Sequence, residues 1–242
     1  MSTKCRADVA LVERGFFASR AQAQAAIAAG GVSVDGVVLH KASQTIASTA
    51  EIIAQAPHPW VSRGGLKLEA ALDAFGFSPE GTRALDLGAS TGGFTHVLLT
   101  RGAAHVHAVD VGHGQLHPLI ANDPRVTMLE GTDARRLAES GVGPFDILTI
   151  DVSFISLKLV LSPVVPLLAQ GAQLVALVKP QFEAGRAHLH KGIVRDAAIH
   201  TQVCDDIRAH IAGLGFTIEG LLPSPITGGD GNREFLLGAH LS

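Results

Sequence analysis

The stretch Asp86-Leu87-Gly88-Ala89-Ser90-Thr91-Gly92-Gly93-Phe94 decides the fold of this chain. It follows a short apolar segment, 83–87, and opens a segment with the pattern of a helix. In a doubly wound parallel sheet, a glycine-rich turn between the first strand and its helix lies at the carboxyl edge, where nucleotide-like ligands bind. The stretch therefore predicts such a sheet with a ligand site above it.

The segments on either side of this turn extend the same pattern. Short runs rich in Val, Ile and Leu alternate with stretches long enough for a crossover helix, and these runs are 83–87, 105–110, 126–130, 146–151 and 173–178. Such alternation is typical of a mostly parallel α/β sheet. Two further runs, 216–222 and 234–241, flank a glycine-rich turn and predict an antiparallel hairpin appended to it.

The first 56 residues have a different pattern. Two short helices are expected, the second with Ser19 as its N-cap, followed by a hairpin that turns at Asp35-Gly36 and a third strand within 45–55. We predict a small domain over 1–56, a linker over 57–61 and a second domain over 62–242. Trp60, in the linker, is expected to pack between the two domains rather than to stack on a base.

Composition excludes several classes of protein. The chain has 242 residues, of which 47% are hydrophobic and 17% charged, and this composition is that of an ordinary globular protein. The N-terminus has no secretory signal and no apolar run is long enough to span a membrane, so a cytoplasmic protein is expected. The two cysteines and twelve histidines show no metal-ligand spacing, and no metal is predicted.

The glycine-rich loop favours one kind of cofactor. A dinucleotide fingerprint would place a second glycine at position 90, where this chain has Ser90, so a nicotinamide oxidoreductase is the least favoured reading. Asp110 ends the next strand, where a carboxylate accepts both hydroxyls of a ribose. S-adenosyl-L-methionine, an adenosine without a pyrophosphate, fits both features. The alternative is that the glycines only make a tight turn.

The candidate cofactor residues are therefore those of the loop and of the next two strand ends. Asp133 follows the third strand and is either a partner for the adenine amino group or a helix N-cap. The full set is Asp86, Gly88, Ser90, Gly92, Gly93, Phe94, Asp110 and Asp133.

Four charged residues are expected to meet at the carboxyl edge of the sheet. Asp151 and Lys179 each end a strand, and Glu234 begins the antiparallel last strand, so it lies beside Lys179. Lys67, on a helix over 66–75, reaches the same edge. The alternative is a set of ordinary ion pairs at a sheet rim.

Two lysines flanked by two carboxylates suit the removal of a proton from a hydroxyl. A lysine becomes a base when desolvation or a neighbouring like charge favours its neutral form, and the carboxylates hold the lysine heads in place. Enzymes that methylate amino groups often have prolines after the fourth strand. Here the corner is Asp151-Val152-Ser153-Phe154, without proline, so an oxygen acceptor is favoured.

Motifs along the whole chain resemble a known family. The N-terminal part resembles an S4 RNA-binding domain through Ala7-Asp8, Gly15, Ser19-Arg20, Gly30-Gly31-Val32 and Val34-Asp35-Gly36. The remainder resembles the FtsJ-like methyltransferase domain of the TlyA family, through the motifs 62–68, 86–94, 178–183, 191–196 and 229–235.

The resemblance implies 2′-O-methylation of ribose in ribosomal RNA, with S-adenosyl-L-methionine as the methyl donor. It places a Lys-Asp-Lys-Glu catalytic tetrad on Lys67, Asp151, Lys179 and Glu234. Members of the family are also labelled haemolysins. Two alternatives therefore stay open, a catalytically inactive ribosome-associated RNA-binding protein and a membrane-active haemolysin.

The S4-like part is weakly basic, with five Lys or Arg against four Asp or Glu in residues 1–61. Phosphate contacts supply much of the affinity for RNA, so the cations matter most. Arg14, Arg20 and Lys41 are the candidate RNA contacts in this part. A second candidate patch, in the other domain, is Arg186, Lys191 and Arg195.

Overall fold

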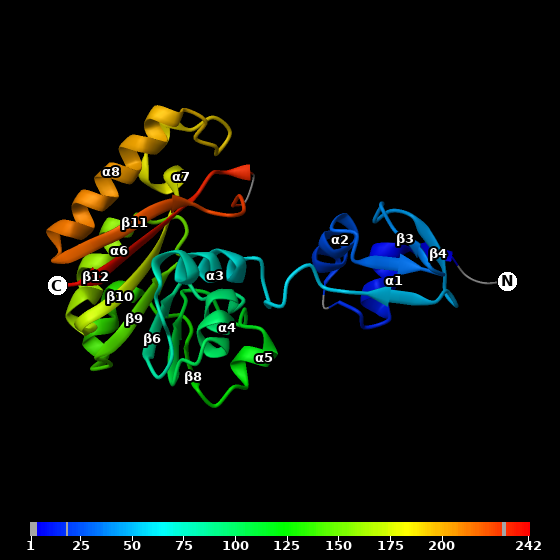
Figure 1. The fold of residues 1–242 in the computed structure, drawn as a ribbon, viewed down its shortest axis with the longest axis horizontal. Helices are drawn as coiled ribbons and strands as arrows, with labels where there is room; N and C mark the ends of the chain where they lie inside the picture. The colour runs from blue at the N-terminus through cyan, green and yellow to red at the C-terminus, as the bar shows by residue number, and fades with distance from the viewer. Residues whose placement is uncertain (1–3, 18, 229–230) are drawn as a thin grey trace. The chain divides into compact units, whose positions relative to one another are not determined.

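The computed structural model describes residues 4–17, 19–228 and 231–242, and the chain divides into two compact units, Met1–Pro59 and Trp60–Ser242 (Figure 1). The division falls inside the segment 57–61. Two residues of the motif 229–235, numbers 229 and 230, lie outside the described residues. None of the helices in the described ranges has the length and apolar character needed to span a bilayer.

The first unit contains two short helices and five short strands. In chain order they are β1 (Lys4–Arg6), α1 (Ala7–Glu13), α2 (Arg20–Ala28), β2 (Val32–Val34), β3 (Val37–Val38), β4 (Thr45–Ala47) and β5 (Ile52–Ala54). The Ser19 hydroxyl accepts a hydrogen bond from Gln22 N and caps α2, as predicted. Asp35 and Gly36 have φ of 49° and 79°, the left-handed pair that the predicted hairpin turn requires.

The expected strand over 45–55 is wrong as a single element. It is two strands in two sheets, because a turn closed by Ala50 N and Ala47 O separates β4 from β5. β4 pairs with β1, a strand that the sequence did not predict, and β5 pairs with β2. The small core beneath them includes Leu11, Ile27 and Ile46.

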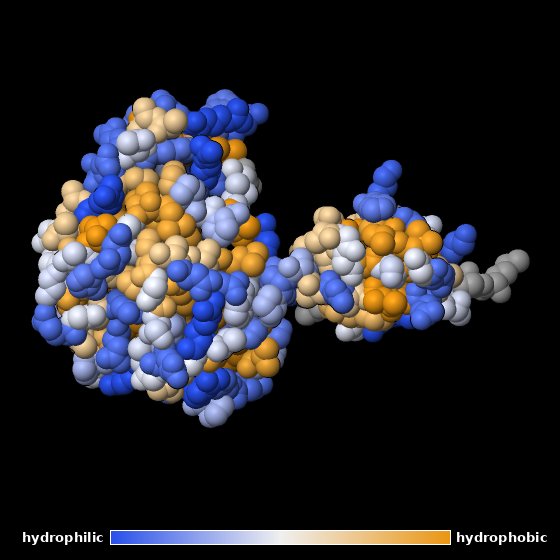
Figure 2. Space-filling view, in the orientation of Figure 1, coloured by the Kyte–Doolittle hydropathy of each residue, from blue (hydrophilic) through white to orange (hydrophobic). Residues whose placement is uncertain are grey.

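The first unit also exposes apolar side chains. Val38 and Ile53 both pair with Ser33 on the central strand, and they are 43% and 60% exposed. Figure 2 shows apolar colouring on this unit beside polar and charged residues. The surface of the first unit therefore combines exposed apolar side chains with polar and charged ones.

The second unit is built on a seven-stranded sheet. The strand order is β11-β12-β10-β9-β6-β7-β8, with bounds β6 (Arg83–Leu87), β7 (His105–Val109), β8 (Val126–Leu129), β9 (Phe145–Ile150), β10 (Leu168–Val178), β11 (Phe216–Pro223) and β12 (Phe235–Leu241). Strands β6 to β10 are parallel, and β12 is antiparallel to both of its neighbours. The predicted fold class is confirmed, and β10 begins earlier than expected.

Helices cover both faces of this sheet (Figure 1). The helices α3 (Gly64–Phe75), α4 (Gly93–Thr100) and α5 (Pro118–Ala121) pack in one apolar cluster, and α6 (Leu157–Val164) and α8 (Ala197–Gly213) pack in another. Short helical turns complete the unit: η1 (Ala134–Ser140), η2 (Val165–Leu167), α7 (Pro180–Glu183) and η3 (Arg186–His188). Burial of both faces explains the almost continuous apolar runs of the strands.

Trp60 packs within the second unit. Its side chain belongs to the cluster that contains Leu68 and Phe94, and the residue is 7% exposed. The indole Nε1 donates a hydrogen bond to Glu69 at 3.1 Å, which satisfies its only polar atom. Trp60 is therefore buried as expected, but its packing partners in this cluster belong to the second unit rather than to both domains.

Candidate active site

The carboxyl ends of two neighbouring strands bring two opposite charges together. Asp151 directly follows β9 and Lys179 directly follows β10, and the Asp151 amide donates to the carbonyl of Leu87 at the end of β6. On the other side of β10, Phe235 pairs with Val178, so Glu234 lies level with Lys179. The antiparallel strand thus brings a third charge to the edge, as predicted.

The four charged residues form two ion pairs. Lys67 Nζ lies 2.5 Å from Glu234 Oε2, and Lys179 Nζ lies 2.6 Å from Asp151 Oδ1. The two lysine side chains are each 10% exposed and the Glu234 side chain is 3% exposed. All four residues line one cavity of about 960 Å³, which we call the tetrad cavity. Each lysine therefore has its own carboxylate to hold it.

Two residues that the sequence reasoning missed brace the Asp151–Lys179 pair. Beside this ion pair, the Ser153 hydroxyl accepts a hydrogen bond from Lys179 Nζ, at 2.9 Å. Glu183, on α7, accepts from the Ser156 hydroxyl at 2.6 Å and from the Leu157 amide at 2.7 Å. The loop after β9 is therefore tied to the loop after β10. The sequence motif 178–183 contains Glu183, but it did not indicate which groups Glu183 contacts.

The glycine-rich loop passes directly over Asp151. Gly88 has φ of +81°, and a Cβ atom there would lie 2.5 Å from the Asp151 carbonyl oxygen. No other residue fits at this position without moving the end of β9. The close approach leaves a cavity on each side of the loop, and Asp151 lines both.

The helix-side cavity, of about 260 Å³, lies between the loop and the start of α3, with Ser62, Lys67 and Phe94 among its lining residues. The strand-side cavity, of about 440 Å³, lies over the ends of β7 and β8, with Asp110 and Asp133 among its lining residues. Gly88 and Ser90 line both cavities, and Gly93 lines the first.

Asp110 is already bonded to the loop. Its carboxylate accepts from the Ser90 amide at 2.8 Å and from the Gly112 amide at 2.7 Å. A carboxylate has about four lone-pair directions, so two remain for a ligand. Asp133 caps η1 and pairs with Arg135, whose hydrogen bond lowers the pKa of Asp133 to about 2. It both caps the helix and lines the strand-side cavity.

Two of the predicted cofactor residues do not line either cavity. Gly92 is the N-cap of α4 with φ of +91°. Asp86 is fully buried below the loop, where it accepts from the hydroxyls of Thr95 at 2.7 Å and Thr149 at 2.9 Å. Burial raises the pKa of Asp86 to about 6, and nearby Asp151 adds to the rise. Asp86 therefore supports the loop from beneath.

The rim of the tetrad cavity is aromatic and cationic. Phe154 is 91% exposed with φ of +65°, a conformation rare for a large side chain, and its ring lies 5.1 Å from that of Phe182. Arg186 lines the same cavity, whereas Lys191 and Arg195 are exposed and do not line it. The sequence analysis assigned no role to either aromatic residue.

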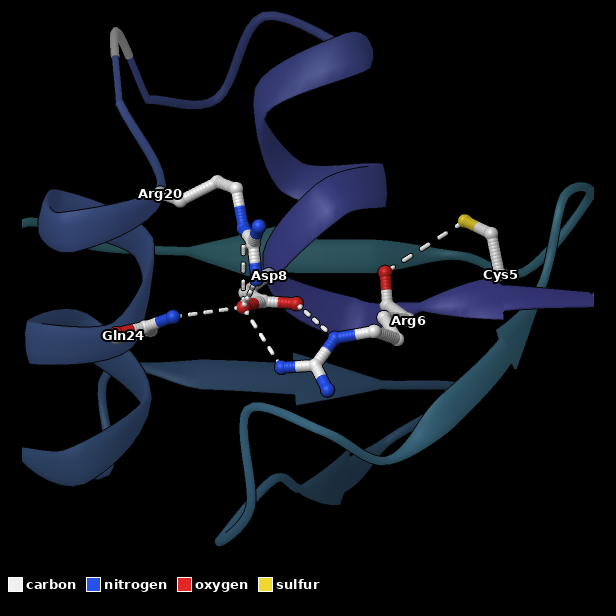
Figure 3. A network of polar contacts seen from close by, with 5 residues as sticks. All are labelled: Cys5, Arg6, Asp8, Arg20 and Gln24. Carbon is white, nitrogen blue, oxygen red and sulfur yellow. Dashed lines mark hydrogen bonds and ion pairs between the residues drawn. The ribbon is translucent and has the colours of Figure 1, made fainter.

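The first unit contains a cluster of cations around one buried carboxylate (Figure 3). Asp8 is inaccessible to solvent and accepts from Arg6 Nε at 3.0 Å, Arg20 Nη2 at 2.8 Å and Gln24 Nε2 at 2.7 Å. These bonds hold the pKa of Asp8 well below its usual range. Arg20 is thus anchored by Asp8, and Arg6, absent from the predicted patch, is anchored beside it.

The other two predicted contacts of this unit have different surroundings. Arg14 Nη1 donates to the Ala50 carbonyl at 2.7 Å, and its guanidinium lies 5.5 Å from the centre of the Phe16 ring. Lys41 is exposed. Across the described ranges, no group of His, Cys, Asp and Glu side chains is arranged to hold a metal ion.

Comparison with known proteins agrees with this geometry. A family described as FtsJ-like methyltransferase matches residues 60–241, and a family described as S4 domain matches residues 5–52. The Mycobacterium tuberculosis protein named 16S/23S rRNA (cytidine-2′-O)-methyltransferase TlyA is 43% identical over 98% of this chain and 90% of its own length. The chain belongs to the TlyA family of FtsJ-like methyltransferases.

Two other members of this family are similarly close. The Bacillus subtilis protein YqxC, named as an rRNA methyltransferase, is 46% identical over 99% of this chain and 86% of its own length. A solved structure described as a hemolysin from Streptococcus thermophilus is 42% identical, with a TM-score of 0.76 over 100% of this chain and 90% of that one. The family and its fold are those of S-adenosylmethionine-dependent methyltransferases.

Proposed function

We propose that this chain transfers a methyl group from S-adenosyl-L-methionine to the 2′-hydroxyl of a cytidine ribose in ribosomal RNA. The observation that carries the proposal is the position of Asp151, which lines both cavities beside the glycine-rich loop and the tetrad cavity as well. A methyl donor bound along the loop and a hydroxyl bound among the four charges would meet at this residue. The choice of cytidine follows the name of the Mycobacterium tuberculosis relative.

The two loop cavities fit the donor in size and chemistry. The strand-side cavity offers Asp110 to the ribose hydroxyls and Asp133 to the adenine amino group. The helix-side cavity offers hydroxyls and backbone amides at the start of α4 to the amino acid portion. The absence of a side chain at Gly88 leaves the loop backbone open between them. The bound donor would supply a methyl group activated by a positively charged sulfur.

The chain's own residues position the acceptor and take its proton. We place the hydroxyl against Lys179, whose neutral form accepts the proton as the oxygen gains the methyl group. Asp151 and Ser153 hold Lys179 Nζ, and Glu234 holds Lys67 Nζ. Because all four groups are fixed before substrate arrives, much of the rate would come from alignment.

The first unit would supply RNA docking. Four cations of the first unit offer contacts to RNA phosphates: the anchored guanidinium groups of Arg6 and Arg20, together with Arg14 and Lys41. In the second unit, Arg186 lies at the tetrad cavity, where the phosphates next to the target nucleotide would pass. Exposed Phe154 offers a face on which a base stacks.

The test is methyl transfer to ribosomal subunits by the purified full chain. Subunits from the source organism lacking the gene are incubated with isotopically labelled S-adenosyl-L-methionine, and the RNA is digested and analysed by mass spectrometry. We expect label in 2′-O-methylcytidine with the wild-type chain and none with Lys179→Met. Lys158→Met, on α6 and at a position that lines none of the three cavities, is the control and should retain activity.

Two results would contradict the proposal. Tight binding of subunits without any transfer would indicate an inactive RNA-binding protein. Release of dye from liposomes at physiological salt and pH, without methyl transfer, would instead favour the membrane activity that the hemolysin name of one relative suggests.

A further inference from the structure

Gln181 occupies a special position in the tetrad cavity. It lies on α7, two residues after Lys179, and its side chain lines this cavity together with those of Phe154 and Phe182. The Gln181 Oε1 atom is buried and has no hydrogen-bond partner among the described residues. A buried amide oxygen without a partner is unfavourable, so such an atom at a binding cavity points to a ligand that donates to it.

Two polar side chains near Gln181 are held by other groups of the protein. Lys179 is bonded to Asp151 and Ser153, and Glu183 accepts two hydrogen bonds from the loop after β9. Neither of them is bonded to Gln181 Oε1. This acceptor therefore stays unpartnered on a residue that lines the tetrad cavity, on the same short helix as Phe182.

We propose that Gln181 reads the exocyclic amino group of the target cytosine; this inference rests on the proposed function. With the ribose hydroxyl at Lys179 and the base against the Phe154 ring, the edge of the base faces the wall of the cavity that carries Gln181. The amino group on C4 of cytosine donates to Oε1, whereas uracil presents a carbonyl oxygen at that place. Gln181 is thus a specificity-determining residue that contacts the base and takes no part in the proton transfer.

The experiment removes each partner of this hydrogen bond in turn. The substrates are splint-ligated ribosomal RNAs that carry cytidine or zebularine at the methylated nucleotide, assembled in the form that the wild-type chain methylates. Zebularine is the pyrimidin-2-one nucleoside, which lacks only the amino group. The values of kcat/KM for methyl transfer are compared for the wild-type chain, Gln181→Met and Gln181→Glu. Affinity for S-adenosyl-L-methionine checks that each variant is folded.

We expect the wild-type chain to methylate cytidine at least about tenfold faster than zebularine, the effect of one hydrogen bond to a buried acceptor. Gln181→Met should bring the two rates together by slowing the cytidine reaction, and Gln181→Glu, which retains an acceptor, should keep the preference. Gln173 is the matched control, since its Oε1 is also buried without a partner but lines none of these cavities. Gln173→Met should keep the wild-type ratio.

Two outcomes would overturn the inference while leaving the proposed function intact: equal rates on cytidine and zebularine with the wild-type chain, or an unchanged preference in Gln181→Met. A wild-type chain that methylates neither RNA would contradict the proposed function itself. The comparison of cytidine with zebularine on the wild-type chain needs no variant. It can therefore overturn the inference even where a substitution disturbs folding.

Discussion

Lys67 Nζ and Glu234 Oε2 lie 2.5 Å apart, although 167 positions separate these residues along the chain. Lys67 is on the helix that leads into the sheet, and Glu234 precedes the last strand of the sheet. The side chains are only 10% and 3% exposed, so each charge depends on the other for compensation. The pair links α3 to the start of β12 and forms part of the proposed catalytic edge.

Glu234→Gln should destabilise the second unit by about 3 kcal/mol, because it leaves Lys67 buried without a counter-charge. The double variant Lys67→Met with Glu234→Leu should recover most of that loss. Unfolding in urea is followed by the fluorescence of Trp60, the only tryptophan. Asp73→Asn, which breaks a surface pair with Arg101, is the control and should cost less than about 1 kcal/mol. Equal costs for the two single variants would refute the prediction.

Lys179→Met should reduce kcat for methyl transfer by about 100-fold or more, since the variant has no group to take the hydroxyl proton. Affinity for S-adenosyl-L-methionine should stay within a few fold, because Lys179 lines the tetrad cavity but neither loop cavity. Single-turnover kinetics and calorimetry measure the two effects separately. Appreciable turnover by the variant would remove Lys179 from the proposed mechanism.

Asp110→Ala should weaken binding of S-adenosyl-L-methionine by about 1.5 to 3 kcal/mol, the range for hydrogen bonds to a charged group. The same change removes the hydrogen bonds from the amides of Ser90 and Gly112, which tie the glycine-rich loop to the end of β7. Calorimetry measures the affinity. Asp123→Ala is the control, because Asp123 is paired with Arg125 and lines neither loop cavity. Unchanged affinity in Asp110→Ala would contradict the assignment.

The stability of the second unit should fall with rising pH through the titration of Asp86. Its pKa is raised to about 6 in the folded chain, so between about pH 4 and pH 6 the folded state binds more protons than the unfolded state, and unfolding becomes easier as pH rises. Asp86→Asn lacks this dependence. The difference in unfolding free energy, variant minus wild type, should therefore increase by up to about 3 kcal/mol from pH 4 to pH 7. A difference independent of pH would show that Asp86 titrates normally.

Affinity for a ribosomal RNA fragment should fall with salt concentration, and replacing Arg14, Arg20 and Lys41 by Ala should flatten that slope by roughly 2 to 3 units. The variant should bind S-adenosyl-L-methionine normally, because all three residues belong to the first unit. Filter binding over a range of salt measures the slope. An unaltered slope would indicate that the contacts with RNA phosphates are made instead by Arg186, Lys191 and Arg195.

The framework of the second unit was predictable from the amino-acid sequence. Apolar runs of strand length mark a sheet buried on both faces, and the glycine loop marks where it binds a ligand. Since parallel strands end at one edge, Asp151 and Lys179 were predictable neighbours, and the antiparallel last strand added Glu234. These conclusions need only the pattern of apolar residues along the sequence and the direction of the strands.

The pairing of individual groups follows from the three-dimensional packing of the chain. It pairs Lys67 with Glu234 and Lys179 with Asp151, buries Asp86 below the loop, and anchors Arg20 on Asp8. It also splits the expected strand over 45–55 and leaves Gln181 Oε1 buried without a hydrogen-bond partner among the residues that the structure describes. The physical reason is that burial and hydrogen bonding depend on atoms distant in sequence, whose positions follow from packing and not from local pattern.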